Sequence, residues 1–573
     1  MRKVLGNIIK FFRSQSVVKI LFLLGYFAIL FGNTLHEEYP DEYDNILGGK
    51  FIIHGILPYS GFFSHHGPVA YFLSALIYLF SGSSFVRFRI IYSIFLFLYS
   101  LGVYQYLKKS IGSIETKFYL FFIAIVGIAA TYFWGHMFIA DNLSAYFITP
   151  VLALIILKVV YRKLITRMDL IFISILLALS LLSALTVIYL VAITYLFCFY
   201  FYLKGINFKI IPKNIIYLLL IMAAPYIVFG VYLLITQSLG DYIYQSIIFN
   251  QKYYIYNYPV PPSGVINPLR YAIIIFHNFY FSFYGVLVSV KDLNFAFPLT
   301  RTMAIADVAL IVYFLTRRYY ALSIFFTLSL FYSASRSSPL ESSEKDYQAA
   351  VYIVISLFSM CFFLSKALAD LKDKEDFRTK LMLSFFFLLV GVYSFFNIIF
   401  LFSRFQEKVY QKYMGNAALI YDRPDLAPII NKIVGAQDYV WIGPLEFKEY
   451  LYVNAKLPSK YQFLIPAMGR SEKVKAEIIS DFTKHKPKVI FLDKNVSILG
   501  SSPATYAKFF LDFINKNYIT LYEYKEGDTQ YRSLIPISDK VDLETKMYID
   551  KDKRQEVIAK MLSENLIKKV PVK

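Results

Sequence analysis

The residues best suited to chemistry lie in a polar segment, residues 37–68, with the sequence EEYPDEYDNILGGKFIIHGILPYSGFFSHHGP. Five of its first eight residues are carboxylates, in a chain whose formal net charge is +20 at pH 7. Asp41, Glu42 and Asp44 are close enough in sequence to disfavour one another's ionisation, so at least one would be a better general base near neutral pH than an isolated carboxylate. The alternative is a solvated acidic loop, which the Gly-, His- and Tyr-rich remainder of the segment disfavours.

A second pair of candidate residues follows in the pentapeptide FVRFR, residues 85–89. Arg87 and Arg89 could donate charge-assisted hydrogen bonds to a phosphate, while Phe85 and Phe88 meet lipid acyl chains. The alternative is that both arginines only anchor the end of a helix by extending toward the membrane surface.

Further polar residues occur in loops and at predicted helix ends. A Tyr-rich loop at 241–264 could stack on sugar faces, or it could form an aromatic belt at the membrane surface. Asp141 could bind substrate, or it could be only the partner of a helix dipole. Lys345 could likewise bind substrate, or it could belong to a solvated loop pair with Asp346. The candidate substrate-binding residues are Asp44, His65, His66, Arg87, Arg89, Asp141, Asn250, Tyr253 and Lys345.

The composition is that of a membrane protein. Of 573 residues, 57% are hydrophobic and 17% are charged, and the mean hydropathy is +0.52. Repeated apolar runs of about 17–25 residues can cross the hydrocarbon as helices, which predicts a polytopic all-α domain rather than a barrel. The excess of Lys and Arg is typical of cytoplasmic loops that face anionic lipid, so we expect no nucleic-acid partner. Cys198 and Cys361 lie in apolar runs and indicate neither a disulfide framework nor a metal site.

The distribution of charge predicts how the chain crosses the membrane. Five Lys and Arg residues precede or begin the first apolar run, which places the N-terminus in the cytoplasm and the acidic segment outside. A single crossing between residues 69 and 106 keeps the later basic clusters inside, so the helix after Pro68 should lie along the outer surface, within a first outer loop at 34–84. The segment 271–290 could be a re-entrant element or part of an extra pair of spans, which gives about 11–13 transmembrane helices in residues 1–403. The predicted spans are 16–33, 85–107, 117–135, 139–161, 168–184, 186–203, 214–236, 301–316, 320–335, 347–366 and 381–403.

After residue 403 the composition becomes charged and mixed. Short β-type runs at 439–442, 489–492 and 520–524 alternate with helix-like segments at 424–434 and 471–485. This alternation predicts a soluble α/β domain over residues 404–573, on the outer, extracytoplasmic face of the membrane.

The string PDEYDNILGGKFIIHGILPYSGFFSHHGPVAYFL resembles the first outer loop of membrane-embedded glycosyltransferases with the GT-C fold. Among them it is most similar to bacterial relatives of protein O-mannosyltransferases and of the aminoarabinose transferases, in glycosyltransferase family 39. Those proteins place an acidic pair just after the first span, then a G-x-x-P-Y segment and an H-x-P or P-P turn before a surface helix. Asp41 and Glu42, residues 55–59 and residues 66–68 occupy these positions, and the resemblance extends over residues 1–400.

The resemblance implies an enzyme of the bacterial cytoplasmic membrane that works at its outer face. It would transfer a sugar, with inversion, from a polyprenyl-phosphate donor to a hydroxyl group of a glycan, lipid or protein acceptor. Asp41 would be the catalytic base, and Glu42 beside it would orient the acceptor or share the role.

The chain departs from the family pattern at residues 65–68, where HHGP stands and two prolines are frequent. The phosphate partner would then be Arg87, Arg89 or Lys345 instead of a residue from this turn. No metal is expected to be obligatory, although the mixture of His and carboxylates could bind a divalent cation.

Two other classes of function remain open at this stage. A transporter or flippase of lipid-linked glycans should place ionisable groups in the middle of the membrane, whereas nearly all of those in this chain are at predicted span ends. An inactive relative that only binds glycan would bind without turnover.

Overall fold

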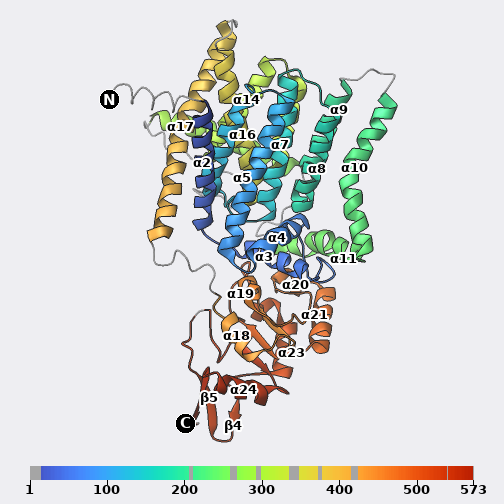
Figure 1. The fold of residues 1–573 in the computed structure, drawn as a ribbon, viewed down its shortest axis with the longest axis vertical. Helices are drawn as coiled ribbons and strands as arrows, with labels where there is room; N and C mark the ends of the chain where they lie inside the picture. The colour runs from blue at the N-terminus through green and yellow to red at the C-terminus, as the bar shows by residue number, and fades with distance from the viewer. Residues whose placement is uncertain are drawn as a thin grey trace. The chain divides into compact units, whose positions relative to one another are not determined.

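The computed structural model describes residues 15–204, 211–257, 268–291, 299–333, 347–371, 377–414, 424–538 and 540–571. The chain folds as two compact units, each assembled from separate stretches of sequence (Figure 1). Unit 1 comprises Met1–Glu38, Val86–Phe229 and Val265–Ile420. Unit 2 comprises Tyr39–Phe85, Gly230–Gly264 and Tyr421–Lys573.

Unit 1 is a bundle of apolar helices. Its longer helices within the described ranges are α2 (Gln15–Gly32), α5 (Phe85–Ser110), α6 (Lys117–Ala129), α7 (Ala140–Val160), α8 (Arg167–Ser183), α9 (Ile188–Lys204), α10 (Ile211–Ile235), α13 (Pro268–Lys291), α14 (Leu299–Thr316), α15 (Tyr320–Ser333), α16 (Ala350–Asp370) and α17 (Phe377–Met414). Helix α5 starts at the last residue of unit 2, and α10 ends in unit 2. Short 3-10 turns extend several of them: η1 (Asn33–Leu35), η2 (Ala130–Tyr132), η3 (Leu185–Val187) and η7 (Tyr347–Ala349).

The core of this bundle is formed by α7 and α16, which pack against each other. In the most apolar stretch of α7, 89% of the residues are buried inside the protein, whereas in that of α10 only 11% are buried. Helices α10 and α17 flank the bundle on opposite sides (Figure 1), and Val228, Leu388 and Phe395 on them are exposed. Exposed apolar side chains in such number are typical of helices that face lipid.

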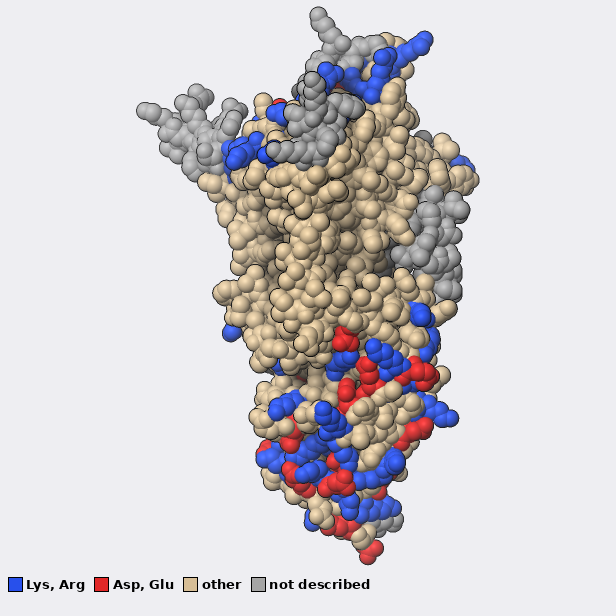
Figure 2. Space-filling view, turned by 90° about the vertical axis from the view of Figure 1, so that its right-hand side faces the viewer, with Lys and Arg blue, Asp and Glu red and all other residues tan. Residues whose placement is uncertain are grey.

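Among the residues that the structure describes, seven helical segments are long and apolar enough to cross a membrane: 18–35, 85–110, 140–160, 185–204, 215–235, 347–370 and 377–407. This is the character of an integral membrane protein, as the composition predicts. Figure 2 shows Lys and Arg gathered at one end of unit 1, next to a broad band without charge. The ambiguous segment 271–290 belongs to one helix, α13, while the number of crossings and the side of each terminus stay predictions.

Unit 2 begins with two helices in close contact, α3 (Pro40–Ile53) and α4 (Val69–Ser81). Two glycines of α3 permit this approach. A Cβ atom on Gly48 would lie 2.1 Å from Cδ1 of Tyr71, and one on Gly49 would lie 2.7 Å from the carbonyl carbon of Ser74. The Gly-Gly pair of the acidic segment is therefore a packing feature, because any larger residue would push the helices apart.

The middle stretch of unit 2 is a broken helix. It runs through α11 (Leu239–Tyr242), the π-helix η5 (Ile243–Ile248), α12 (Phe249–Lys252) and the 3-10 turn η6 (Tyr254–Asn257). A π-helical turn rotates the following side chains relative to a regular helix, and such turns often occur at functional sites.

The C-terminal stretch of unit 2 is a mixed α/β region. A four-stranded sheet has the order β1 (Val440–Gly443), β2 (Val489–Leu492), β6 (Met547–Asp550) and β3 (Tyr518–Thr520), with β1 and β2 parallel and β6 antiparallel to both neighbours. A smaller antiparallel sheet contains β4 (Lys525–Glu526), β5 (Thr529–Ser533) and β7 (Ile567–Pro571). The helices are α18 (Ala427–Ile433), α19 (Phe447–Tyr452), α20 (Pro466–Gly469), α21 (Glu472–Lys484), α22 (Pro503–Tyr506), α23 (Lys508–Asn517) and α24 (Arg554–Ser563).

Two of the three predicted strands are present, and the third is displaced. The predicted strand 520–524 overlaps β3 only at Thr520, because the chain turns there. The carboxylate of Glu523 accepts a hydrogen bond from the Thr520 N–H (3.1 Å), and the Thr520 hydroxyl accepts one from the Glu523 N–H (3.3 Å). This reciprocal pair closes a turn over residues that have strand-forming side chains.

The α3–α4 contact can be tested with Gly49→Ala. The added methyl group meets backbone, which cannot rotate away, so the free energy of unfolding should fall by about 1–3 kcal/mol. Thermal unfolding of the full-length protein in detergent measures the change. Gly240→Ala in α11 is the matched control because a Cβ there has no atom within 4 Å. Equal melting temperatures for the two variants would contradict the close contact.

Candidate functional site

The acidic residues of α3 lie in three different environments. Tyr39 is extended and Pro40 occupies the first helical turn, which begins the helix at this point. Asp41 and Glu42 are in that first turn, where the helix dipole stabilises negative charge. Asp41 is half-buried, whereas Glu42 and Asp44 are buried.

Asp44 is held by side chains from two distant parts of unit 2. Its Oδ2 accepts a hydrogen bond from the Tyr71 hydroxyl on α4 (3.1 Å), and its Oδ1 accepts one from Nε2 of Gln462 (3.3 Å). The Tyr71 hydroxyl in turn accepts a hydrogen bond from the hydroxyl of Ser64 (2.9 Å). Nε2 of Gln462 also donates to the carbonyl of Phe63 (3.0 Å), so the network ties α3 and α4 to the segment between them.

Burial has a direct effect on this carboxyl group. The pKa of Asp44 is raised to about 7, first by burial and then by the nearby charge of Asp41, against the hydrogen bonds from Gln462 and Tyr71. The sequence predicted a carboxylate with this property among three neighbours. In the structure the cause is mainly loss of water, not mutual repulsion.

This shift predicts a pH dependence of stability. Between the ordinary value of 3.8 and about 7, the folded protein holds a proton on Asp44 that the unfolded chain releases, so the free energy of unfolding falls as the pH rises through this window. Asp44→Asn is neutral at every pH and removes the effect. The melting temperature of the variant relative to wild type should therefore be higher at pH 8 than at pH 5.

Thermal unfolding at both pH values, with Asp528→Asn on an exposed turn as the control, measures this difference. Parallel pH profiles for wild type and Asp44→Asn would show that the carboxyl group keeps its ordinary behaviour when folded.

The turn that carries His65 and His66 is held in place by the broken helix of residues 239–257. Nδ2 of Asn250 donates to the carbonyl of His65 (2.8 Å), and the Tyr59 hydroxyl donates to the carbonyl of His66 (3.0 Å). The two imidazole rings lie 4.0 Å apart, and the ring of Tyr254 lies 4.7 Å from that of His65. Two stretches that the sequence predicted to share a site, the acidic segment and the Tyr-rich loop, are thus in contact within unit 2.

Gln245 adds two more hydrogen bonds between the broken helix and the turn. Its side-chain oxygen accepts the N–H of Ser64 (2.9 Å), and its Nε2 donates to the carbonyl of Tyr59 (2.8 Å). Tyr253, another predicted substrate residue, is half-buried, and its carbonyl accepts a hydrogen bond from Arg470 (3.1 Å). Most of the polar contacts around residues 59–66 therefore go to backbone, which makes this turn a fixed part of the fold.

The two arginines of FVRFR have different surroundings in unit 1. Residues two positions apart on a helix project roughly 200° apart, so Arg87 is exposed while Arg89 is 1% exposed. The Arg89 guanidinium donates to the carbonyls of His36 (2.5 Å) and Glu37 (2.6 Å), immediately after η1. Phe88, expected to meet acyl chains, is buried against Phe138.

Arg89→Lys tests this backbone contact. A lysine has one ammonium group and cannot present the planar fork that bonds to both carbonyls, so the variant should lose at least about 1.5–3 kcal/mol of stability, the value of one charge-assisted hydrogen bond. Thermal unfolding measures the loss, and Arg87→Lys on the exposed face should melt with wild type. An Arg89→Lys protein that is fully stable but binds a phosphate-bearing donor less well would assign Arg89 to the phosphate instead.

Two further predicted site regions belong to unit 1. Asp141 lies in the first turn of α7 and is buried. His136, just before this helix, is placed with Nε2 3.2 Å from the carbonyl of Glu37, and its ring is 5.3 Å from that of His36. Burial lowers the pKa of His136, and the positive charge of Arg89 lowers it further. Lys345 lies outside the described residues.

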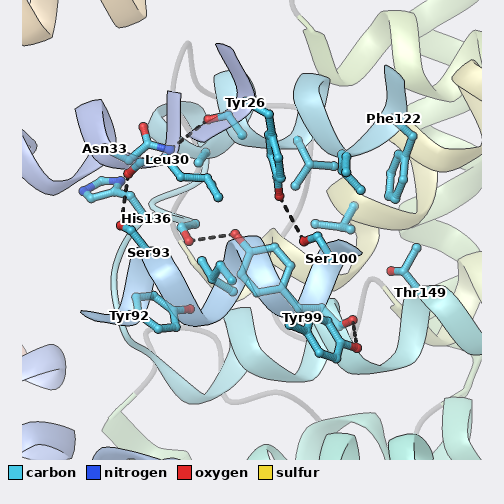
Figure 3. Close-up of a pocket in the computed structure, with 18 of the residues that line it drawn as sticks. Tyr26, Leu30, Asn33, Tyr92, Ser93, Tyr99, Ser100, Phe122, His136 and Thr149 are labelled. Atoms are coloured by element: carbon cyan, nitrogen blue, oxygen red, sulfur yellow. Dashed lines mark hydrogen bonds between the residues drawn. The ribbon is translucent and has the colours of Figure 1, made fainter. Parts of the chain in front are cut away.

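A cavity inside unit 1 is too small for a sugar. It holds about 50 Å³, which is room for water. Figure 3 shows Tyr26, Ser93, Tyr99 and Asn33 around it. The hydroxyl groups are used within the bundle, for example from Tyr26 to Ser100 (2.9 Å) and from Ser93 to the carbonyl of Leu30 (3.0 Å). This cavity is therefore a polar packing site between helices.

Within the described ranges, no three His, Cys, Asp or Glu side chains are grouped so that they could hold a metal ion. Sequence reasoning missed the residues that position Asp44, namely Ser64, Tyr71, Gln245 and Gln462. Tyr71 is one of four hydroxyl-bearing residues of α4, so its type alone does not single it out, and Gln462 gives no signal because it is 418 residues from its partner.

The geometry therefore assembles one candidate site in unit 2, with a half-buried acid, Asp41, on a helix that a buried network of side chains fixes in place. Comparison of the chain with known protein families, with characterised proteins and with solved structures finds no match.

Proposed function

We propose that the protein is a membrane-embedded glycosyltransferase of the GT-C type. It transfers a sugar from a polyprenyl-phosphate donor to a hydroxyl group of a glycan, lipid or protein acceptor, with inversion at the anomeric carbon. The observation that carries the proposal is the contrast between Asp41 and Asp44: a half-buried carboxylate in the first turn of α3, and a buried one that fixes the same helix. The resemblance of residues 40–73 to the first outer loop of these enzymes supports it.

The reaction needs a base for the acceptor and a cation for the leaving group. Asp41 takes the proton of the acceptor hydroxyl as its oxygen forms a bond to the anomeric carbon. The bond from that carbon to the phosphate oxygen breaks on the opposite face, and polyprenyl phosphate leaves with the electron pair. Arg87 is the exposed arginine of FVRFR, so it is the better candidate of the two for the phosphate. The outer face of the cytoplasmic membrane is the proposed location.

The network around Asp44 would keep the base in position. Catalysis by a general base depends on a fixed approach to the hydroxyl group, and a helix anchored through Tyr71 and Gln462 provides it. Glu42 lies in the same turn as Asp41 but is buried, which suits a role in orienting Asp41 more than direct contact with the acceptor.

One observation favours a second candidate, a transporter or flippase of lipid-linked glycans. Asp307 is in the middle of α14 and 0% exposed, and its carboxylate accepts hydrogen bonds from the hydroxyls of Ser356 (2.7 Å) and Ser359 on α16. An ionisable group in such a position often belongs to a transport pathway. The sequence argument against transport, that ionisable groups lie at span ends, does not hold for this residue.

Asp41→Asn tests the transferase. The variant should fold and melt like wild type but lose transfer from the polyprenyl-phosphate donor by about 10²–10⁴-fold, the usual contribution of a general base. Mass spectrometry of envelope glycans and lipid-linked sugars, in cells that carry wild type, the variant or no gene, measures it. Donor should accumulate beside an under-glycosylated product in the second and third strains.

Asp528→Asn serves as the control for loss of one carboxylate and should restore the product. Full transfer by Asp41→Asn would remove Asp41 from the mechanism. If Asp307→Asn instead blocks the product while Asp41→Asn does not, the transporter is the better proposal. Binding of glycan with no turnover in any strain would indicate an inactive relative.

A further inference from the structure

A groove of about 870 Å³ lies in unit 2, apart from the acidic first turn of α3. One wall is the C-terminal end of α3 with the turn after it, the second is the extended segment 453–460, and the third is one face of α21. Its volume falls within the range of about 300–1,000 Å³ that is usual for ligand sites. The residues that hold Asp44 do not line it.

The α21 wall presents a regular row of polar side chains. Glu477, Asp481 and His485 are spaced four residues apart, which puts them on one face of the helix and its C-terminal cap. Between them Ile478 and Phe482 point into the core of the domain and are buried. The helix is therefore anchored by its apolar face, and its polar face forms the groove.

The charged groups of the groove mostly have partners inside the protein. Nζ of Lys50 donates to the carbonyls of Tyr450 (2.8 Å), Leu451 and Val453. Lys460 pairs with Glu477 and Asp241, both at 3.1 Å, and Asp481 accepts a hydrogen bond from Ser459 (2.6 Å). The groove therefore offers little uncompensated charge, which fits a phosphate or another strongly charged ligand poorly.

Other residues of the groove contribute aromatic rings and neutral polar groups. The rings of Tyr439 and His485 lie 5.0 Å apart, both half-buried, and form a small aromatic surface. His54 and Asn454 on the other two walls are exposed. Aromatic faces that pack against C–H groups, next to amide, imidazole and carboxylate groups that bond to hydroxyls, are what a sugar requires.

We propose that this groove binds a neutral oligosaccharide. The proposal goes beyond the transfer reaction and does not depend on it, because binding in the groove needs neither the lipid-linked donor nor Asp41.

The test is binding of neutral oligosaccharides to the purified full-length protein in detergent, with no lipid-linked donor present. An array of neutral two- to six-sugar oligosaccharides, with acidic and phosphorylated sugars beside them, identifies the probe, and titration calorimetry measures its affinity. Tyr439→Leu keeps the apolar bulk but removes the aromatic face, so it should weaken binding about 10-fold or more. Tyr522→Leu, an exposed tyrosine of the same domain outside the groove, should bind like wild type.

Asn454→Ala and His54→Ala, both exposed, carry the test if Tyr439→Leu melts early, and each should weaken binding several-fold. The proposal is wrong if no neutral oligosaccharide binds, if only acidic or phosphorylated sugars bind, or if all three groove variants bind like wild type. Loss of transfer by Asp41→Asn with unchanged binding, or the reverse, separates the failure of one proposal from that of the other.

Discussion

The approach of α3 to α4 is the contact on which the candidate site depends. Gly48 lies one turn after Asp44, so both are on the face of α3 that meets α4. The Tyr71 ring lies against Gly48, and its hydroxyl reaches the carboxyl group of Asp44 (3.1 Å). The ring of Tyr71 fits between the helices because Gly48 and Gly49 have no side chains. The same packing thus excludes water from Asp44 and provides one of its two hydrogen-bond donors.

The burial of Asp44 explains why the acidic residues differ although they are neighbours in sequence. Loss of water raises the pKa of Asp44, the charge of Asp41 adds to the rise, and the hydrogen bonds from Tyr71 and Gln462 offset only part of it, which leaves the pKa at about 7. Asp41 is one turn earlier and half-buried. Neighbouring acids in such different environments can take different roles. The proposed transfer reaction therefore takes Asp41 as its base and gives Asp44 the anchoring role.

Local patterns in the sequence predicted the local structure. Apolar runs located most helices of unit 1 to within a few residues, and the β-type runs at 439–442 and 489–492 became β1 and β2. The run at 520–524 was wrongly predicted as a strand. Two hydrogen bonds, each from the backbone N–H of one residue to the side chain of the other, close a turn between Thr520 and Glu523. A turn made by two side chains cannot be recognised from strand propensity alone.

The tertiary partners of the site could not be predicted in this way. Gln462 meets Asp44 only through the fold, and no spacing indicates it. Arg87 and Arg89 looked like one phosphate site because they are close in sequence, but the helix turns them to different sides. The Gly-Gly pair at 48–49 lies where two helices touch, a role that depends on a partner helix elsewhere in the chain.

Helix α3 belongs to both proposed sites. Asp41 is in its first turn, and Lys50, nine residues later, lines the groove, which is about 14 Å along the helix axis. A saccharide in the groove and a hydroxyl group at Asp41 would therefore be separated by more than one sugar ring. If both proposals hold and the saccharide in the groove is itself the acceptor, that acceptor must be an extended glycan, because a single sugar cannot occupy the groove and reach the base together. Residues nine positions apart also project roughly 180° apart around a helix, so such a glycan would have to pass from one side of α3 to the other.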